Sequence, residues 1–208
     1  MRYSTQARPA PHSSGRAFNY PKAKTLPVYS CMERSGPITI TLEPWEYEHA
    51  ANIGIRRYTA NWSKTNASWY DANRMEDERT AQVASCVAEL AVAKHTNRYW
   101  GGHVWHHSEH HTYRDVPDVG SNIEVRRVRK PAAKAAVRAH QLGHGLVLWV
   151  AYPVPPEFRE VHLLGWLPYD TAWELATPAA YDKKGTTRVI DPSHLRTELP
   201  QDRWQVAA

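Results

Sequence analysis

The sequence predicts a soluble α/β domain in which helices flank a mixed central sheet, preceded by an extended arm. Its 208 residues fit one domain, and 42% apolar residues suffice for a core. Residues 75–97 have the apolar spacing of a strong helix, and several strand-like segments follow it. One of these, 146–152, is wholly apolar, which is typical of a strand buried on both faces. A strong helix before several strands indicates a mixed α/β domain.

Residues 1–37 form the predicted arm, and residues 38–208 form a single domain. The arm holds six basic residues against Glu33 alone, which accounts for the whole net charge of +5. Its repeated prolines interrupt helices and central strands, so we expect extended or disordered chain here. A basic arm can contact phosphates without sequence preference, but a solvated tail or a docking segment for a partner protein fits equally well.

The domain is predicted to begin with one strand and two helices. Residues 38–42 alternate like a short strand. Pro44 suits the first turn of a helix over 43–57. Residues 58–73 show no clear period and predict a loop. The helix over 75–97 then carries an apolar stripe at spacings of three and four.

The second half of the domain is predicted to be rich in strands. Asp170 is placed to cap a short helix before the last strand. After that strand, Asp191 and Pro192 suit the cap and the first turn of a terminal helix. The expected strands are Val104–Trp105, 122–129, 146–152, 161–167 and 187–190, with caps at Asp170 and Asp191.

The composition argues against a membrane-spanning or disulfide-stabilised protein. The longest apolar stretch, 146–152, is far too short to cross a bilayer. No apolar run follows the basic start, so we expect no secretory signal and a cytoplasmic location. The only cysteines are Cys31 and Cys86, and the second lies on the buried shoulder of a predicted helix, where it is interpreted as a small core residue.

The segment from Asp118 to Arg126 carries the strongest indication of chemistry. On a strand, alternate side chains share a face, so Ile123 and Val125 are expected to face a core. Glu124 and Arg126 then lie together on the other face, just after Asp118. Two carboxylates supply hard oxygen ligands for Mg²⁺ or Mn²⁺. Such an ion lowers the pKa of a bound water and stabilises charge on a phosphate, although Glu124 and Arg126 also suit a plain surface ion pair.

Six motifs occur in an order that points to one family. They are Cys86–Lys94 (CVAELAVAK), Tyr99–Trp100, Asp118–Gly120 (DVG), Ile123–Arg126 (IEVR), Val161–Leu167 (VHLLGWL) and Asp191–Arg196 (DPSHLR). In this order the chain resembles the PD-(D/E)XK nuclease-like proteins encoded by bacteriophages, from about residue 75 to residue 199. The resemblance implies a restriction-endonuclease-like core and a Mg²⁺- or Mn²⁺-dependent hydrolysis of phosphodiesters, with DNA the favoured substrate, in the cytoplasm of the host cell.

Carried over position by position, the resemblance implies four catalytic residues. Asp118 and Glu124 would hold the metal, and Glu89 would complete its shell or orient the water. Asp115 is a fallback for Asp118, since Arg114–Asp118 contains both. Arg126 stands where active nucleases usually carry Lys, and it would stabilise the phosphate.

Two departures from the family pattern leave an alternative open. Arg126 does not lose its proton in proteins, so it cannot act as a general base. The connection between Asp118 and Glu124 is also short. The alternative is a catalytically inactive nuclease fold that binds nucleic acid or a host or phage protein, the arm being one route to such a partner. A third interpretation is a virion or assembly component that docks through the arm.

A basic cluster follows the Asp118–Arg126 segment. No acidic residue occurs from Val125 through Pro156. Beside a metal site, such a cluster suits a nucleic-acid backbone, although a solvated loop is the plainer interpretation. The predicted contact residues are Arg127, Arg129, Lys130, Lys134 and Arg138.

Five histidines crowd into the segment His103–His111. Imidazole is a common zinc ligand, and His106 and His110 would meet on one helical turn. No cysteine or well-placed fourth ligand accompanies them. We therefore expect a polar loop here in preference to a zinc site.

Overall fold

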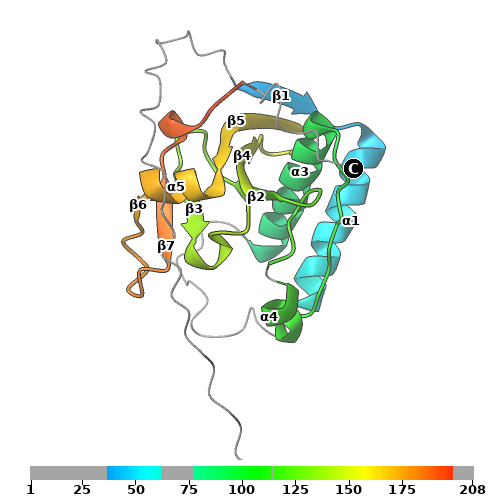
Figure 1. Cartoon of the computed structure of the whole chain (residues 1–208). Coiled ribbons are helices and arrows are strands. Elements are labelled where there is room, and N and C mark those ends of the chain that lie inside the picture. Colours follow the sequence, from blue (N-terminus) through cyan, green and yellow to red (C-terminus); the bar gives the residue numbers. More distant parts are fainter. Residues whose placement is uncertain (1–36, 62–76, 114, 199–208) are drawn as a thin grey trace, which may run out of the picture. The chain divides into compact units, whose positions relative to one another are not determined.

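The computed structural model describes residues 37–61, 77–113 and 115–198, and the α/β class with a mixed sheet flanked by helices is confirmed (Figure 1). The predicted arm, apart from Pro37, lies outside the described residues, as do residues 62–73 of the predicted loop. Among the described helices, none combines the length and apolarity that crossing a membrane requires.

The main sheet contains four strands in the order β1-β5-β4-β2. The outer strand β2 runs parallel to β4, whereas β5 is antiparallel to both of its neighbours, so the sheet is mixed. The bounds are β1 Ile38–Thr41, β2 Ile123–Arg127, β4 Val147–Pro153 and β5 Glu160–Pro168, each close to its predicted range.

A second sheet of three strands has the order β3-β7-β6. Strand β7 (Thr187–Ile190) was predicted, and β6 (Thr177–Pro178) is a short edge. Strand β3 (Ala135–Arg138), which the sequence did not predict, pairs with β7 inside the basic segment for which a solvated loop was the plainer alternative. The solvated-loop interpretation of this segment is therefore wrong for β3, whose Ala135 and Val137 are buried.

Two long helices pack against each other beside the main sheet (Figure 1). Helix α1 (Pro44–Ala60) begins at the proline, and Glu46 closes a capping box with Glu43. Helix α3 (Glu78–Thr96) starts where the Asp77 carboxylate accepts two backbone N–H groups. Both helices agree with the predicted ranges within a few residues.

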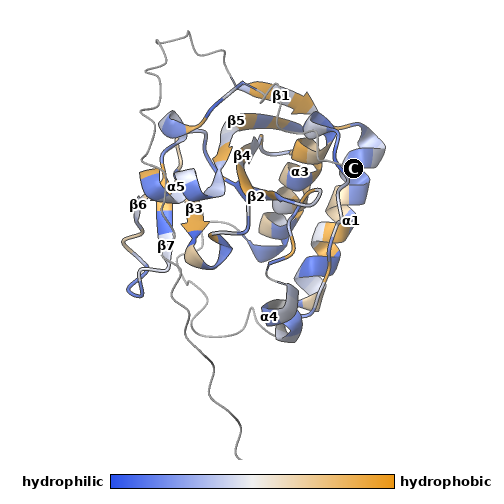
Figure 2. Ribbon diagram, viewed as in Figure 1, coloured by the Kyte–Doolittle hydropathy of each residue, from blue (hydrophilic) through white to orange (hydrophobic). Residues whose placement is uncertain are grey.

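The main sheet separates two hydrophobic cores. On one face, Trp149 and Ala151 of β4 pack with α3, and on the other, Leu148 and Val150 pack with the second sheet. This strand is therefore buried on both faces, as predicted. Figure 2 shows apolar residues along the strands and polar residues on much of α1. Cys86 lies fully buried in the first core, as expected.

Three shorter elements differ from their predictions. Residues Val104–Trp105 form no strand; the chain there is irregular and follows Gly102, whose φ is +53°. Asp170 lies inside the first turn of α5 (Tyr169–Leu175), which follows directly from β5, so it is not the cap residue. The predicted terminal helix is a single 3-10 turn, Pro192–His194, in which Asp191 does accept the N–H of Ser193.

Replacement of Gly54 by Ala is expected to destabilise the protein by about 1–3 kcal/mol. A Cβ at this position would lie 2.6 Å from Cα of Val83, so α1 and α3 would have to separate. Urea unfolding monitored by circular dichroism measures the change, and Ala51→Gly, on the same helix but only partly buried, is the control for helix propensity alone. Equal stability of Gly54→Ala and wild type would contradict this packing.

Candidate functional site

A pocket of about 420 Å³ lies where α1, α3, the segment 103–118 and strands β2 and β3 meet. Of the predicted catalytic residues, Glu89, Asp118 and Arg126 line it. Glu124 is buried and forms an ion pair with Arg126. The remaining lining residues are Arg57, Asn61, Glu78, Gln82, Ser85, His103, Trp105, Val125, Arg127 and Arg138.

Asp118 is positioned by a tight turn that connects it to β2. Val119 and Ile123 exchange two backbone hydrogen bonds of 3.1 Å across this turn. Gly120 has a φ of +58°, a conformation that suits glycine, and its N–H donates to Tyr99 O at 2.8 Å. The chain thus folds back at once, and Oδ2 of Asp118 accepts the N–H of Val125 at 2.8 Å. The short spacing between Asp118 and Glu124 is therefore no obstacle to their proximity.

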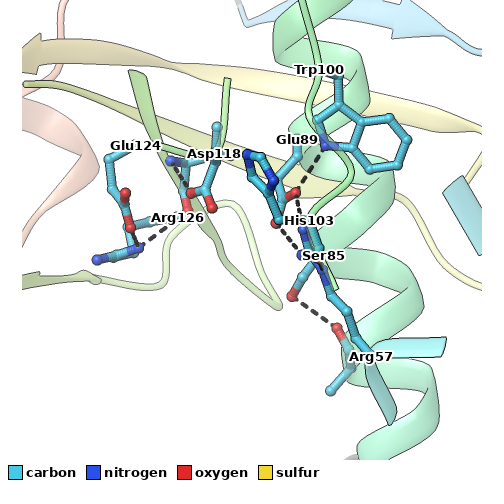
Figure 3. A network of polar contacts seen from close by, with 10 residues as sticks. Arg57, Ser85, Glu89, Trp100, His103, Asp118, Glu124 and Arg126 are labelled. Carbon is cyan, nitrogen blue, oxygen red and sulfur yellow. Dashed lines mark hydrogen bonds and ion pairs between the residues drawn. The ribbon is translucent and has the colours of Figure 1, made fainter. Parts of the chain in front are cut away.

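The carboxyl of Asp118 has a pKa well above its ordinary value of 3.8. Burial is the main cause, and the negative charges of Glu89 and Glu124 add to it. The charge of Arg126 and the hydrogen bond from Val125 act in the opposite sense without reversing the shift. Figure 3 shows Asp118 between the Glu124–Arg126 pair and Glu89, which places three carboxylates around one region.

Glu124 and Arg126 lie on one face of β2, as predicted, while Ile123 and Val125 join the core. The Arg126 guanidinium binds Glu124 and also donates to Ala136 O at 3.0 Å and to Gln141 Oε1 at 2.6 Å. Although burial alone would lower it, the charge of Glu124 raises the pKa of Arg126 above its usual range. The interpretation of this pair as a plain exposed one is wrong, because Glu124 is only 6% exposed.

Behind Arg126, a buried polar network connects the two sheets. Gln141 is 3% exposed, and its Oε1 also accepts the hydroxyl of Tyr169 at 2.5 Å. The Tyr169 oxygen in turn accepts the backbone N–H of Arg138 at 2.8 Å. These bonds hold Arg126 in one orientation between β2 and β3.

Glu89 projects from α3 and is held by partners from two other segments. Arg57 of α1 donates to both its carboxylate oxygens, at 2.6 and 2.8 Å, a bidentate pair. Trp100 Nε1 donates at 2.9 Å to Oε2 (Figure 3). Arg57 Nε also donates to His103 O at 2.7 Å, which fixes the start of the histidine-rich segment.

Two residues of the predicted basic track, Arg127 and Arg138, line the pocket. The Arg138 side chain forms no hydrogen bond or ion pair within the part of the chain that the structure describes. Arg138 is itself exposed at the end of β3, but desolvation by the surrounding pocket walls, followed by the positive charge of Arg126, lowers its pKa. The other members, Arg129, Lys130 and Lys134, are exposed and lie outside the lining of the pocket.

The donor chemistry at Asp118 fits a hard divalent cation. A cation would offset the repulsion among Asp118, Glu89 and Glu124 that raises the pKa of Asp118. Glu89 and Glu124 are each bound to an arginine, however, and in the described ranges no three His, Cys, Asp or Glu side chains are grouped as metal ligands. Asp118 is thus the ligand whose surroundings best suit a metal, and Asp115, which is exposed, lies outside the pocket lining.

The histidine-rich segment adopts two short helical turns, His107–Glu109 and α4 (His110–Tyr113), where the sequence predicted a loop. Its His106 Nδ1 lies 2.8 Å from Ser108 Oγ, and His106 N–H donates to Glu109 at 3.2 Å. The side chain of His103 lines the pocket.

In comparisons with known proteins, no family model matches the chain, and neither a curated protein nor a solved structure matches it significantly.

Sequence reasoning missed several residues that build the site. Arg57 ends the predicted first helix, and its partner Glu89 lies 32 residues away, so local spacing gave no indication of the pair. Gln141 and Tyr169 were missed for the same reason, because they meet Arg126 only through the packing of β3 and α5 beside β2.

Proposed function

We propose that the chain is a metal-dependent nuclease, encoded by a bacteriophage, that hydrolyses phosphodiesters of DNA in the cytoplasm of its bacterial host. The observation that carries this proposal is the set of three carboxylates, Asp118 with Glu89 and Glu124 near it, beside a pocket whose walls present arginines. Functional sites concentrate such perturbed acidic groups in clefts. The order of motifs that resembles the PD-(D/E)XK family supports the same assignment.

In this proposal each residue has a stated task. Asp118 and Glu124 supply oxygen ligands to Mg²⁺ or Mn²⁺. Glu89, oriented by Arg57, accepts a hydrogen bond from the attacking water. A bound divalent ion would lower the pKa of that water and offset charge on the phosphate. Arg126 holds Glu124 in place through their ion pair, and Arg138 is the guanidinium with donors available for a phosphate oxygen.

Titration calorimetry with Mn²⁺ tests the proposal directly. Wild type is expected to bind the ion, and the double variant Asp118→Asn/Glu124→Gln to bind it at least about 10–100-fold more weakly. Both amides keep an oxygen that can accept the hydrogen bonds from Val125 and Arg126, so the fold is expected to survive. Asp115→Asn is the matched control and is expected to bind as wild type does. Equal binding by wild type and the double variant would overturn the metal site.

A second candidate is a catalytically inactive nuclease fold that binds nucleic acid or a host or phage protein. The observation that favours it is the complete engagement of Arg126, at the usual lysine position, by Glu124, Gln141 and Ala136 O. This candidate predicts binding of labelled DNA that EDTA leaves unchanged, together with no cleavage of any strand in Mn²⁺. Cleavage that EDTA abolishes would exclude it.

A further inference from the structure

Three aromatic rings form a ladder in the histidine-rich segment. The His103 and Trp105 rings stack with centroids 5.7 Å apart and planes 29° apart. The Trp105 and Tyr113 rings stack at 5.5 Å and 21°. Trp105 is therefore the middle ring of a near-parallel set, a geometry that favours stacking of aromatic groups.

The backbone around the ladder fixes one of its ends. The His103 ring packs on Gly101, where an added Cβ would lie 2.3 Å from Nε2, so a larger residue there would displace the ring. Arg57 Nε holds His103 O at 2.7 Å, which ties this end to the floor of the pocket. At the other end, the Tyr113 side chain belongs to α4 and is 40% exposed. A further ring is therefore best accommodated at the Tyr113 end.

The ladder borders the cationic wall of the pocket. His103 and Trp105 line the same pocket as Arg127 and Arg138. Arg138 has guanidinium donors that no group in the described ranges uses. A nucleotide needs both features at once: a flat apolar surface for its base and a guanidinium for its phosphate.

We propose that the His103–Trp105–Tyr113 ladder is a base-stacking subsite for single-stranded nucleic acid, with Arg138 contacting the phosphate. This inference rests on the proposed function, because a strand whose base stacks on the ladder would carry its backbone past Asp118, Glu89 and Glu124. Bases in a duplex are stacked on one another, so only an unpaired or displaced base presents a free face to Tyr113. The substrate class is thus single-stranded nucleic acid. The motifs of the sequence did not distinguish single-stranded from double-stranded substrates.

Fluorescence anisotropy of two labelled oligonucleotides in EDTA tests the subsite without cleavage. One is a single-stranded oligothymidylate, and the other is an equally long strand whose bases are replaced by abasic residues. Wild type is expected to bind the first more tightly. Tyr113→Ala is expected to weaken binding of the oligothymidylate about tenfold and to leave the abasic strand unchanged.

Two variants serve as controls. Tyr113→Phe keeps the ring and is expected to bind as wild type does. Tyr99→Ala makes the same truncation at a tyrosine that is 78% exposed and does not belong to the ladder, and it is expected to have no effect. Equal losses on both strands for Tyr113→Ala, or no binding of either strand by wild type, would overturn the subsite. If wild type fails to bind Mn²⁺ but the oligonucleotides bind as expected, the nuclease proposal is overturned and the base-stacking subsite is supported.

Discussion

Replacing Asp118 by Asn is expected to lower the proposed metal-dependent cleavage at least about 100-fold and, at the same time, to make the protein more stable at neutral pH. The loss of activity follows because an amide is a poor ligand for a hard cation. The gain in stability follows because the carboxyl of Asp118 is partly buried between Glu89 and Glu124, whose charges oppose its ionisation. Opposite effects on activity and stability are characteristic of a residue kept for function.

The pH dependence of this gain can be derived from the direction in which the pKa of Asp118 moves on folding. Folding raises this pKa above its ordinary value of 3.8, so between the two values the folded state binds more protons than the unfolded state. The free energy of unfolding therefore falls as the pH rises through this window. Above the folded pKa, the ionised carboxyl of Asp118 destabilises the folded state by its full amount. A tenfold change in an acid dissociation constant corresponds to about 1.4 kcal/mol. Asn does not titrate, so its advantage grows as the pH rises above the ordinary value, is largest above the folded pKa and disappears below the ordinary value.

Thermal unfolding at several pH values measures this difference. Asp118→Asn is expected to melt a few degrees above wild type at neutral pH, since about 1 kcal/mol shifts the midpoint by roughly 2–4 °C in a protein of this size. Near pH 4 the two curves are expected to converge. Mn²⁺ is expected to raise the midpoint of wild type only, because a ligand stabilises the state that binds it. A lower midpoint for Asp118→Asn at neutral pH, with Asp115→Asn unchanged, would contradict the charge arrangement.

The parts of the fold that the sequence predicted well are those set by local periodicity. The alternation in β2 placed Ile123 and Val125 in the core and Glu124 with Arg126 opposite, because successive side chains of a strand must point to opposite faces. The apolar run of β4 is buried on both sides, since each face meets its own core. The failures occur where distant contacts override local pattern. Strand β3 forms because it pairs with β7, and the first residues of these two strands, Ala135 and Thr187, lie 52 positions apart in the sequence.

The same distinction applies to the candidate site. Glu89, Asp118 and Arg126 were found from the sequence, and the structure brings all three to one pocket. The aromatic ladder was missed because Val104–Trp105 was interpreted as a strand and the residues after it as a loop, and neither interpretation places Tyr113 beside Trp105. The positive φ at Gly102 and the turns at 107–113 instead bring His103, Trp105 and Tyr113 together. Such turns depend on tertiary contacts, among them the bond from Arg57 to His103 O.

Replacing Arg57 by Met is expected to destabilise the protein by about 3–5 kcal/mol. The variant leaves the Glu89 carboxylate, whose side chain is 6% exposed, without its bidentate partner. In the intact pair, the attraction between the two charges offsets the cost of removing them from water. Without Arg57 the buried carboxylate keeps its desolvation cost and loses this attraction, so the variant loses more stability than the ion pair contributes. The double variant Arg57→Met/Glu89→Gln removes that charge and keeps an acceptor for Trp100, so it is expected to recover much of the loss. Urea unfolding of the four proteins in this cycle gives the coupling energy.

A second ion pair between the same helices provides the control for this prediction. Lys94 of α3 contacts Glu46 of α1 at 2.6 Å, but the Lys94 side chain is 36% exposed. Solvent screens such a pair, so Lys94→Met is expected to cost at most about 1 kcal/mol. Similar losses for Arg57→Met and Lys94→Met would contradict the prediction that Arg57 is the partner on which the buried Glu89 depends. The Arg57 contact also holds Glu89 near Asp118, whose pKa is raised by burial first and by the charge of Glu89 next, so the stability of the helix pair and the chemistry of the pocket depend on the same contact.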